Sequence, residues 1–124
     1  MPKKCLIVDD TFETVDIVTF LLKRAGYDVL TAYDGEQGLK MARAELPDLI
    51  LLDIMMPVMD GLTMNRRLKE DPKTRPIPVI IMTARGGMEP MFQGSKDSPI
   101  QGYLVKPFSQ QELLRRIDDL LKKA

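Results

Sequence analysis

Five polar residues stand directly after short runs of apolar residues, and their side chains suit chemistry on a phosphoryl group. They are two adjacent acids, a third acid, a hydroxyl and an ammonium, namely Asp9, Asp10, Asp53, Thr83 and Lys106. If the apolar runs are neighbouring parallel strands, all five side chains emerge at one edge of one sheet. In open α/β sheets, ligands bind at this edge, beyond the carboxyl ends of the strands. The spacing therefore predicts a site for a divalent cation and a phosphoryl group.

The residue types suit both the cation and the phosphoryl group. Mg²⁺ prefers oxygen ligands in an octahedron and is commonly held by one or two carboxylates plus phosphate oxygens. Asp10 and Asp53, on adjacent strand ends, could supply these carboxylates, while Asp9 could hold a coordinated water. A carboxylate is also a nucleophile toward phosphorus and then forms an aspartyl phosphate. A lysine offers a compact positive charge, and phosphoryl transfer depends mostly on positioning and charge stabilisation.

The elements that must position these residues alternate along the chain. Apolar runs predict strands, and segments with helical periodicity predict helices between them. The expected strands are 4–8, 27–32, 49–52, 79–82 and 103–105, and the clearest expected helices are 12–25, 35–45, 61–69 and one that follows Ser109. Apolar runs without alternation suit strands that are covered on both faces, and right-handed crossovers favour a doubly wound sheet. We therefore expect an α/β fold with a five-stranded parallel sheet built from five strand–helix units, (βα)5.

Helix starts are marked by capping residues, whereas one segment resists assignment. Asp34, Asp60 and Ser109 are expected N-caps, and Glu112 completes a capping box with Ser109. Residues 86–101 should contain the fourth helix, but they are rich in glycine, proline and serine, which are poor helix formers. We expect an irregular or shortened fourth helix near Pro90–Gln93, where proline suits the first turn, followed by a loop.

Length, charge and residue content exclude several classes of protein. A chain of 124 residues fits one domain, 1–124. It is either a stand-alone protein or a domain excised from a longer one, and its start and end favour the first. Lysine plus arginine and aspartate plus glutamate both total 18, which argues against an electrostatic DNA binder. The sequence has no histidine, so any histidine chemistry must come from a partner. Cys5 is the only cysteine, and its apolar run predicts a buried, reduced thiol and a cytoplasmic setting. No apolar stretch approaches the roughly 18 residues of a membrane span, and the first apolar run is too short for a signal peptide.

The motifs together match a known family. They are Leu6-Ile7-Val8-Asp9-Asp10, then Asp53 within Leu-Leu-Asp-Ile-Met-Met-Pro-Val-Met-Asp-Gly, then Thr83-Ala84, and then Tyr103-Leu104-Val105-Lys106-Pro107-Phe108. In this order and with these spacings, the chain resembles the receiver domain of bacterial two-component response regulators over essentially its whole length. The resemblance implies a flavodoxin-like sheet with strand order 2-1-3-4-5. It also implies a phosphorylation-controlled signalling switch.

The resemblance further implies a role for individual residues. Asp53 would accept a phosphoryl group from the phosphohistidine of a sensor histidine kinase or a histidine phosphotransfer protein. Mg²⁺, with Mn²⁺ as an alternative cation, would be bound by Asp53 and the two adjacent acids of the first motif, together with the backbone carbonyl of Met55. Lys106 would contact the phosphoryl group, and Thr83 would move toward it after phosphorylation. Tyr103 would turn inward when this happens.

The remaining matched positions concern structure and phosphate lifetime. Pro107 occupies the position of the family's cis-proline, which suits a tight turn. Met55 would lie beside the phosphoryl group, where an apolar side chain hinders an attacking water, so we expect slow autodephosphorylation. The downstream target is expected to be a protein, with no contact of this chain to nucleic acid or membrane. The prolines and glycines after Arg85 depart from the family pattern, in which this segment is a regular helix that forms part of the output face.

Three other functions fit parts of the pattern. A metal-dependent phosphatase of the haloacid dehalogenase type would use an aspartyl intermediate, but it needs a second acid two residues after the nucleophile, where Met55 stands. A flavodoxin-like cofactor carrier would need a Ser/Thr/Gly-rich phosphate loop after the first strand, whereas residues 9–12 are acidic. A receiver that binds partners without phosphorylation is not favoured, because all five site residues are present.

Overall fold

The sheet has the predicted topology. The computed structural model describes residues 3–84, 94–95 and 98–122. Five parallel strands form one sheet in the order β2-β1-β3-β4-β7, with β1 (Lys4–Val8), β2 (Asp28–Ala32), β3 (Leu49–Asp53), β4 (Val79–Thr83) and β7 (Gly102–Val105). Counted along this sheet alone, the order is 2-1-3-4-5, so the doubly wound, flavodoxin-like fold is confirmed. β3 lies at its centre and ends on Asp53.

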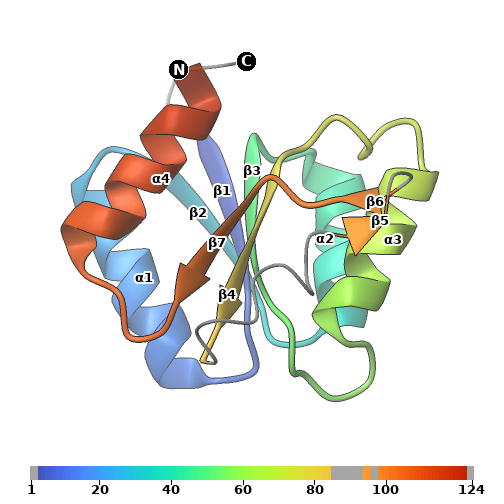
Figure 1. The fold of residues 1–124 in the computed structure, drawn as a ribbon, viewed down its shortest axis with the longest axis horizontal. Coiled ribbons are helices and arrows are strands. Elements are labelled where there is room, and N and C mark those ends of the chain that lie inside the picture. The colour runs from blue at the N-terminus through green and yellow to red at the C-terminus, as the bar shows by residue number, and fades with distance from the viewer. Residues whose placement is uncertain (1–2, 85–93, 96–97, 123–124) are drawn as a thin grey trace.

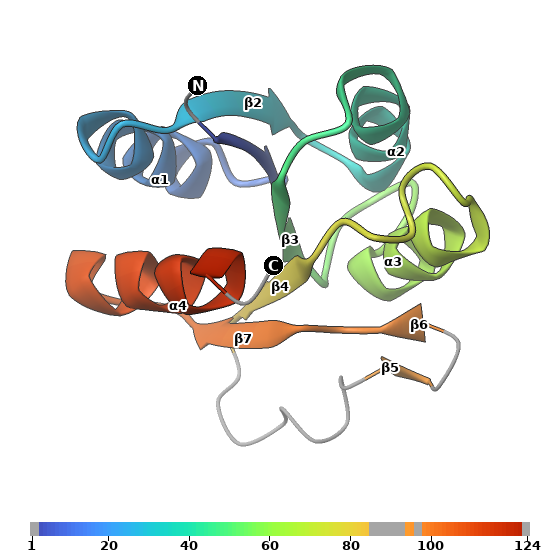
Figure 2. The ribbon, with the colours of Figure 1, turned by 90° about the horizontal axis from the view of Figure 1, so that it is seen from above.

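Helices cover both faces of the sheet. Figures 1 and 2 show α1 (Phe12–Arg24) and α4 (Gln110–Lys122) on one face, and α2 (Gly35–Glu45) and α3 (Gly61–Glu70) on the other. The helix that we expected near Pro90–Gln93 lies outside the described residues. Among the helices that the structure describes, none is long and apolar enough to cross a lipid bilayer.

Two separate cores explain why the apolar runs do not alternate with polar residues. Side chains of a strand point to opposite faces in turn, and here both faces are covered. Leu6, Val8 and Ile50 pack on the side of α2 and α3, while Ile7 and Leu51 pack on the side of α1 and α4. Cys5, a free thiol, is fully buried in the second core as expected. Burial also raises the pKa of this thiol, which keeps it protonated.

The predicted capping residues fix where helices begin. The side chain of Asp34 accepts a hydrogen bond from the backbone N–H of Gln37 at 2.8 Å. Asp60 accepts one from Thr63 N–H, also at 2.8 Å, and the Ser109 hydroxyl accepts one from the N–H three residues on at 3.0 Å. Each bond satisfies a backbone donor that the first helical turn leaves unpaired. The caps therefore fix the residue at which each of these helices begins.

Part of the segment that we predicted as a loop forms a small second sheet. β5 (Gly94–Ser95) and β6 (Ser98–Pro99) pair in antiparallel fashion, and β6 lies beside α3 (Figure 2). Glycine, serine and proline have low strand propensity, which is why their composition indicated a loop. Strands of two residues need little propensity, because one short ladder of backbone hydrogen bonds suffices to pair them.

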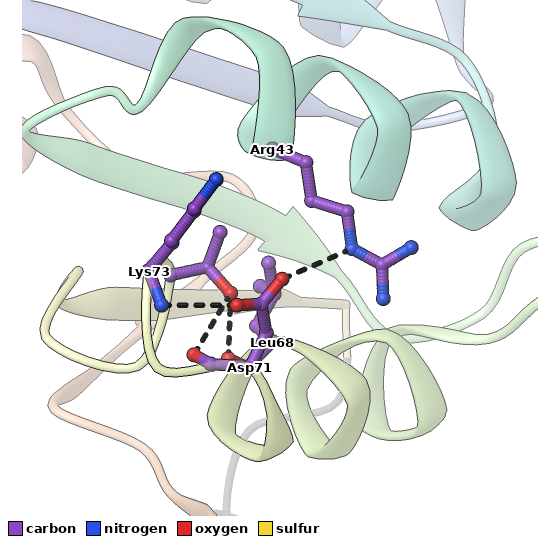
Figure 3. Close-up of polar contacts among 5 residues, drawn as sticks. Arg43, Leu68, Asp71 and Lys73 are labelled. Atoms are coloured by element: carbon purple, nitrogen blue, oxygen red, sulfur yellow. Dashed lines mark hydrogen bonds and ion pairs between the residues drawn. The ribbon is translucent and has the colours of Figure 1, made fainter.

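The loop between α3 and β4 is held by polar contacts at the amino end of the sheet. Thr74 Oγ1 donates to the carbonyl of Leu68 at 2.7 Å. Figure 3 shows Asp71 between two partners, with its Oδ2 atom 3.4 Å from Arg43 Nε and its Oδ1 atom accepting from the Lys73 backbone N–H at 2.9 Å. These contacts join the end of α3 to α2 and direct the chain into β4.

Candidate functional site

The five predicted site residues lie at the carboxyl edge of the sheet. Asp9 directly follows β1, Asp53 and Thr83 are the last residues of β3 and β4, and Lys106 directly follows β7. The register aligns these ends, because Val8 pairs with Leu52, Asp53 with Met82, and Thr83 with Val105. Each polar residue therefore emerges at nearly the same height on its strand, as the sequence predicted.

Three carboxylates form a tight cluster. Asp9, Asp10 and Asp53 each offer one carboxylate oxygen, and these atoms lie within 4.8 Å of one another. Asp9 is fully buried and Asp53 is 8% exposed, whereas Asp10 is open to solvent. One oxygen of Asp9 accepts a hydrogen bond from the Thr11 backbone N–H at 2.9 Å, which orients the carboxylate. The cluster is thus accessible from one side and closed by the sheet on the other.

Lys106 places a positive charge in the acid cluster. Its Nζ donates to Asp9 Oδ2 at 2.7 Å and lies 3.7 Å from Asp53 Oδ1. The backbone N–H of Lys106 donates to the Thr83 carbonyl at 2.7 Å, which ties the end of β7 to the end of β4. The Lys106–Pro107 peptide bond is cis. One ammonium faces three carboxylates, so the cluster keeps an excess of negative charge.

This charge excess acts on the central carboxyl. Burial raises the pKa of Asp53 to about 6, and the carboxylates of Asp9 and Asp10 act in the same direction. Lys106 and the backbone N–H of Ile54 act against this shift. At neutral pH Asp53 is therefore ionised, but its charge is disfavoured enough that a cation would stabilise it. A carboxylate in this state can serve as a ligand and as a nucleophile.

The loop after β3 forms one wall of the site and is fixed by a glycine. The Gly61 N–H donates to the Ile54 carbonyl at 2.8 Å. A Cβ atom at Gly61 would collide with the backbone carbonyl oxygen of Asp53, so only glycine lets α3 begin this close to the site. The loop and an acid together line a cavity of about 460 Å³, formed by Asp10, Ile54, Met55, Met56, Pro57 and Asp60.

The donor set fits a hard divalent cation. All the clustered side-chain donors are carboxylate oxygens, and Mg²⁺ prefers oxygen ligands with several waters kept in its shell. Asp10, the exposed acid, opens toward the cavity described above, which has room for such waters. A cation there would also offset the effects of burial and of the neighbouring carboxylates, which together raise the pKa of Asp53. Binding by the carbonyl of Met55 remains a prediction.

Comparison with known proteins places the chain in a family. The family model of the response regulator receiver domain matches residues 5–118. The chain belongs to this family. It is 44% identical over 123 residues to the DNA-binding dual master transcriptional regulator RpaA of Synechocystis sp., covering 99% of this chain and 50% of RpaA. It is 43% identical to the response regulator PleD of Caulobacter vibrioides, covering 98% of this chain and 27% of PleD. The chain thus spans half or less of the length of these relatives.

Solved receiver structures share the fold closely. A putative response regulator from Chloroflexus aurantiacus superposes with a TM-score of 0.90 at 34% identity, covering 98% of this chain and 99% of the other. The receiver domain of the sensor histidine kinase PA1611 from Pseudomonas aeruginosa has a TM-score of 0.87 at 27% identity, with 98% and 99% covered. That structure has a magnesium ion coordinated in its active site cleft. The family and this neighbour support a receiver domain and do not favour a phosphatase of the haloacid dehalogenase type.

The two residues expected to act as a switch lie on adjacent strands of the receiver. Thr83 is buried at the end of β4, with 6% of its surface exposed. Tyr103 on β7 pairs in register with Ile81 and is half-buried against the core on the side of α2 and α3. This arrangement is compatible with a coupled movement of the two side chains, and the movement itself remains a prediction.

An apolar groove, which we did not predict from the sequence, lies on the other side of the receiver's site from the cavity lined by Asp10. It has a volume of about 400 Å³ and runs between α1 and the segment after β7, lined by Thr14, Ile17, Val18, Ala84, Lys106, Pro107 and Phe108. Outside the groove lining, Phe12 and Phe20 of α1 are also 67% and 59% exposed, and the Phe12 ring contacts Tyr33. The signal was present in the sequence, because Ile17 and Phe20 lie off the buried stripe of this helix.

Proposed function

We propose that Asp53 of this receiver domain accepts a phosphoryl group in a reaction that depends on a divalent cation. The observation that carries the proposal is the convergence of three carboxylate oxygens within 4.8 Å, with the ammonium of Lys106 3.7 Å from Asp53. Asp9 and Asp10 hold the cation with Asp53 and the carbonyl of Met55. When bound, Mg²⁺ offsets negative charge on the transferring group, and Mn²⁺ offers the same chemistry.

The chain's own residues perform the remaining work of the transfer. A carboxylate oxygen of Asp53 forms the new O–P bond while the N–P bond of a phosphohistidine breaks, and the imidazole leaves with the electron pair of that bond. Lys106 neutralises charge on the phosphoryl oxygens, moving from Asp9 toward the new group. The hydroxyl of Thr83 donates a hydrogen bond to a phosphoryl oxygen. Tyr103 then moves inward, and the surface around it changes for a downstream protein.

The phosphoryl donor that suits a response regulator receiver domain is a sensor histidine kinase or a histidine phosphotransfer protein. This chain has no histidine, so the phosphohistidine belongs to the donor. We place the donor's docking surface on α1 and the apolar groove. The groove shares Lys106 with the site, so a protein seated there brings its histidine beside Asp53. Ile17, which lines the groove and is 59% exposed, offers a test. Ile17→Asp should slow transfer from a phosphorylated kinase and leave phosphorylation by acetyl phosphate unchanged.

One experiment tests the phosphoacceptor directly. The protein is incubated with MgCl₂ and acetyl phosphate, and intact mass spectrometry follows the addition of one phosphoryl group. We expect the addition in the wild-type chain, and we expect it to vanish with EDTA and in Asp53→Asn. A signal that persists in Asp53→Asn would reject this acceptor. In a steady-state assay, multiple rapid turnovers of small phosphoesters would instead support the phosphatase alternative, whereas we expect only self-directed transfer and hydrolysis.

A further inference from the structure

The loop that forms one wall of the site contains a residue with a strained backbone conformation. This conformation does not bury the residue's side chain. Val58 has φ of 71°, in the left-handed region that β-branched residues rarely adopt. Its side chain is 75% exposed, so no burial compensates for the strain. Backbone conformations of this kind persist only where the surrounding structure enforces them, and they concentrate at functional sites.

The strain has a defined local geometry. The Met59 N–H donates to the Pro57 carbonyl at 2.7 Å, across the single residue Val58. A bond between residues i and i+2 with positive φ at the centre is the rare, strained form of γ-turn. It reverses the chain within three residues, directly after the segment Ile54–Pro57 that lines the cavity with Asp10.

Both flanks of this turn are fixed, so the turn decides where the segment between them lies. Before the turn, the Ile54 carbonyl accepts a hydrogen bond from the Gly61 N–H at 2.8 Å. After the turn, Asp60 caps α3, and Met59 packs so closely on α2 that a Cβ atom at Gly35 would collide with the Met59 carbonyl oxygen. With these ends anchored, a change of φ at Val58 must displace the chain that faces Asp10.

We propose that Val58 is a positioning residue for the cation, because its positive-φ turn holds the Ile54–Pro57 wall opposite the acid cluster. The inference rests on the proposed function, which places the cation among the acids and the carbonyl of Met55. Side chains that permit positive φ at position 58 preserve cation affinity. Any change that forbids the turn weakens it.

The test measures Mg²⁺ affinity by titrating MgCl₂ into the full chain and following NMR amide shifts, without any phosphoryl donor. Val58→Gly keeps the turn free of strain and should bind Mg²⁺ within about twofold of wild type. Val58→Pro fixes φ near −65° and should weaken binding at least about tenfold, the range seen when support of metal ligands is lost. Should Val58→Pro fold poorly, Met59→Pro removes the N–H donor of the turn and has the same expected result.

A second left-handed residue supplies the matched control. Leu46 has φ of 46°, is 48% exposed and ends α2, with its N–H donating to Ala42 at 2.9 Å. Leu46→Pro also removes a positive φ and a backbone N–H donor, but at a position away from the acids. It should therefore leave Mg²⁺ affinity unchanged. The inference is overturned if a folded Val58→Pro or Met59→Pro variant binds Mg²⁺ within about twofold of Leu46→Pro. A wild-type chain that binds no Mg²⁺ would instead overturn the proposed function.

Discussion

Two lysines at opposite ends of the sheet have very different partners, although the side chain of neither is fully exposed. Lys106, at the carboxyl edge, contacts the carboxylates of Asp9 and Asp53. Lys69, near the amino end of β4, is 3% exposed, and its ammonium donates to the backbone carbonyls of Arg75 at 3.1 Å and Ile77 at 2.6 Å. Its partners are neutral, and burial, with the charge of Arg75, lowers the pKa of Lys69 to about 8.

The different partners indicate different roles: Lys69 holds a loop in place, whereas Lys106 belongs to the candidate site. At the amino end, the ammonium donates to two backbone carbonyls of the loop after α3, and these contacts tie the loop to the helix. At the carboxyl edge, adding an ammonium leaves an excess of negative charge, and the pKa of Asp53 stays raised to about 6. Stability alone does not explain three acids in this place. A ligand that brings positive charge does explain them.

Removing Lys106 should produce the largest effect, and the quantity affected should be the rate of phosphorylation. Lys106→Ala deletes the ammonium beside Asp53, and loss of one group that stabilises transition-state charge costs about 100-fold in rate. We expect a decrease of this order in the rate of phosphorylation by acetyl phosphate, measured by intact mass over time. Lys69→Ala is the control and should keep the wild-type rate. Equal rates in the two variants would remove the distinction between the lysines.

Removing Lys69 should instead act on stability. Lys69→Ala leaves the carbonyls of Arg75 and Ile77 without their donor and deletes a packed stem, so we expect a loss on the order of 2 kcal/mol in the free energy of unfolding. Urea denaturation measures this value. Lys40 is exposed and forms only a surface pair with Glu36 at 3.7 Å, so Lys40→Ala should change stability by less than about 0.5 kcal/mol. If Lys69→Ala lost as little unfolding free energy as Lys40→Ala, the contacts of the Lys69 ammonium would contribute little to stability.

The lowered pKa of Lys69 predicts the sign of a pH dependence. Its folded-state pKa of about 8 lies below the usual value of 10.5. Between these values the unfolded chain binds the proton and the folded chain has released it, so unfolding free energy rises with pH. Relative to Lys69→Met, wild type should gain about 1 kcal/mol between about pH 7 and about pH 9. A difference that stays flat or falls with pH would contradict the assigned direction.

Met55 should have the smallest effect, on the lifetime of the phosphate. Its side chain is 71% exposed at the mouth of the cavity that contains Asp10. An apolar group there hinders an attacking water, whereas an amide can orient one. Met55→Asn should therefore shorten the phosphate lifetime by about threefold, a difference of under 1 kcal/mol in the barrier. Loss of the phosphoryl mass after removal of acetyl phosphate gives the rate, and an unchanged lifetime would exclude this role for Met55.

The strands and their polar ends could be predicted because each depends on a local pattern. An apolar run covered on both faces has few other solutions, and a parallel register then places Asp53 and Thr83 at one edge without further information. The caps at Asp34, Asp60 and Ser109 were predictable for the same reason. Each requires only a side-chain oxygen and an N–H three residues away.

Features that depend on tertiary contacts could not be predicted in this way. Valine disfavours positive φ, so nothing in the sequence indicates the turn at Val58. The anchoring of Lys69 requires a loop to fold back over the end of α3, while in the sequence it is one more charge on an amphipathic helix. The need for glycine at position 61 becomes evident only when a Cβ atom is placed against the Asp53 carbonyl.

The proposed function depends on Asp53 as the residue that carries the phosphoryl group, and chemical trapping tests this role most directly. The chain is phosphorylated with acetyl phosphate and MgCl₂, and sodium borohydride then reduces the acyl phosphate to an alcohol. Peptide mass spectrometry locates the reduced residue. We expect reduction at position 53 alone, and only when Mg²⁺ is present. Reduction at Asp9 or Asp10, or a reaction that proceeds equally in EDTA, would contradict it.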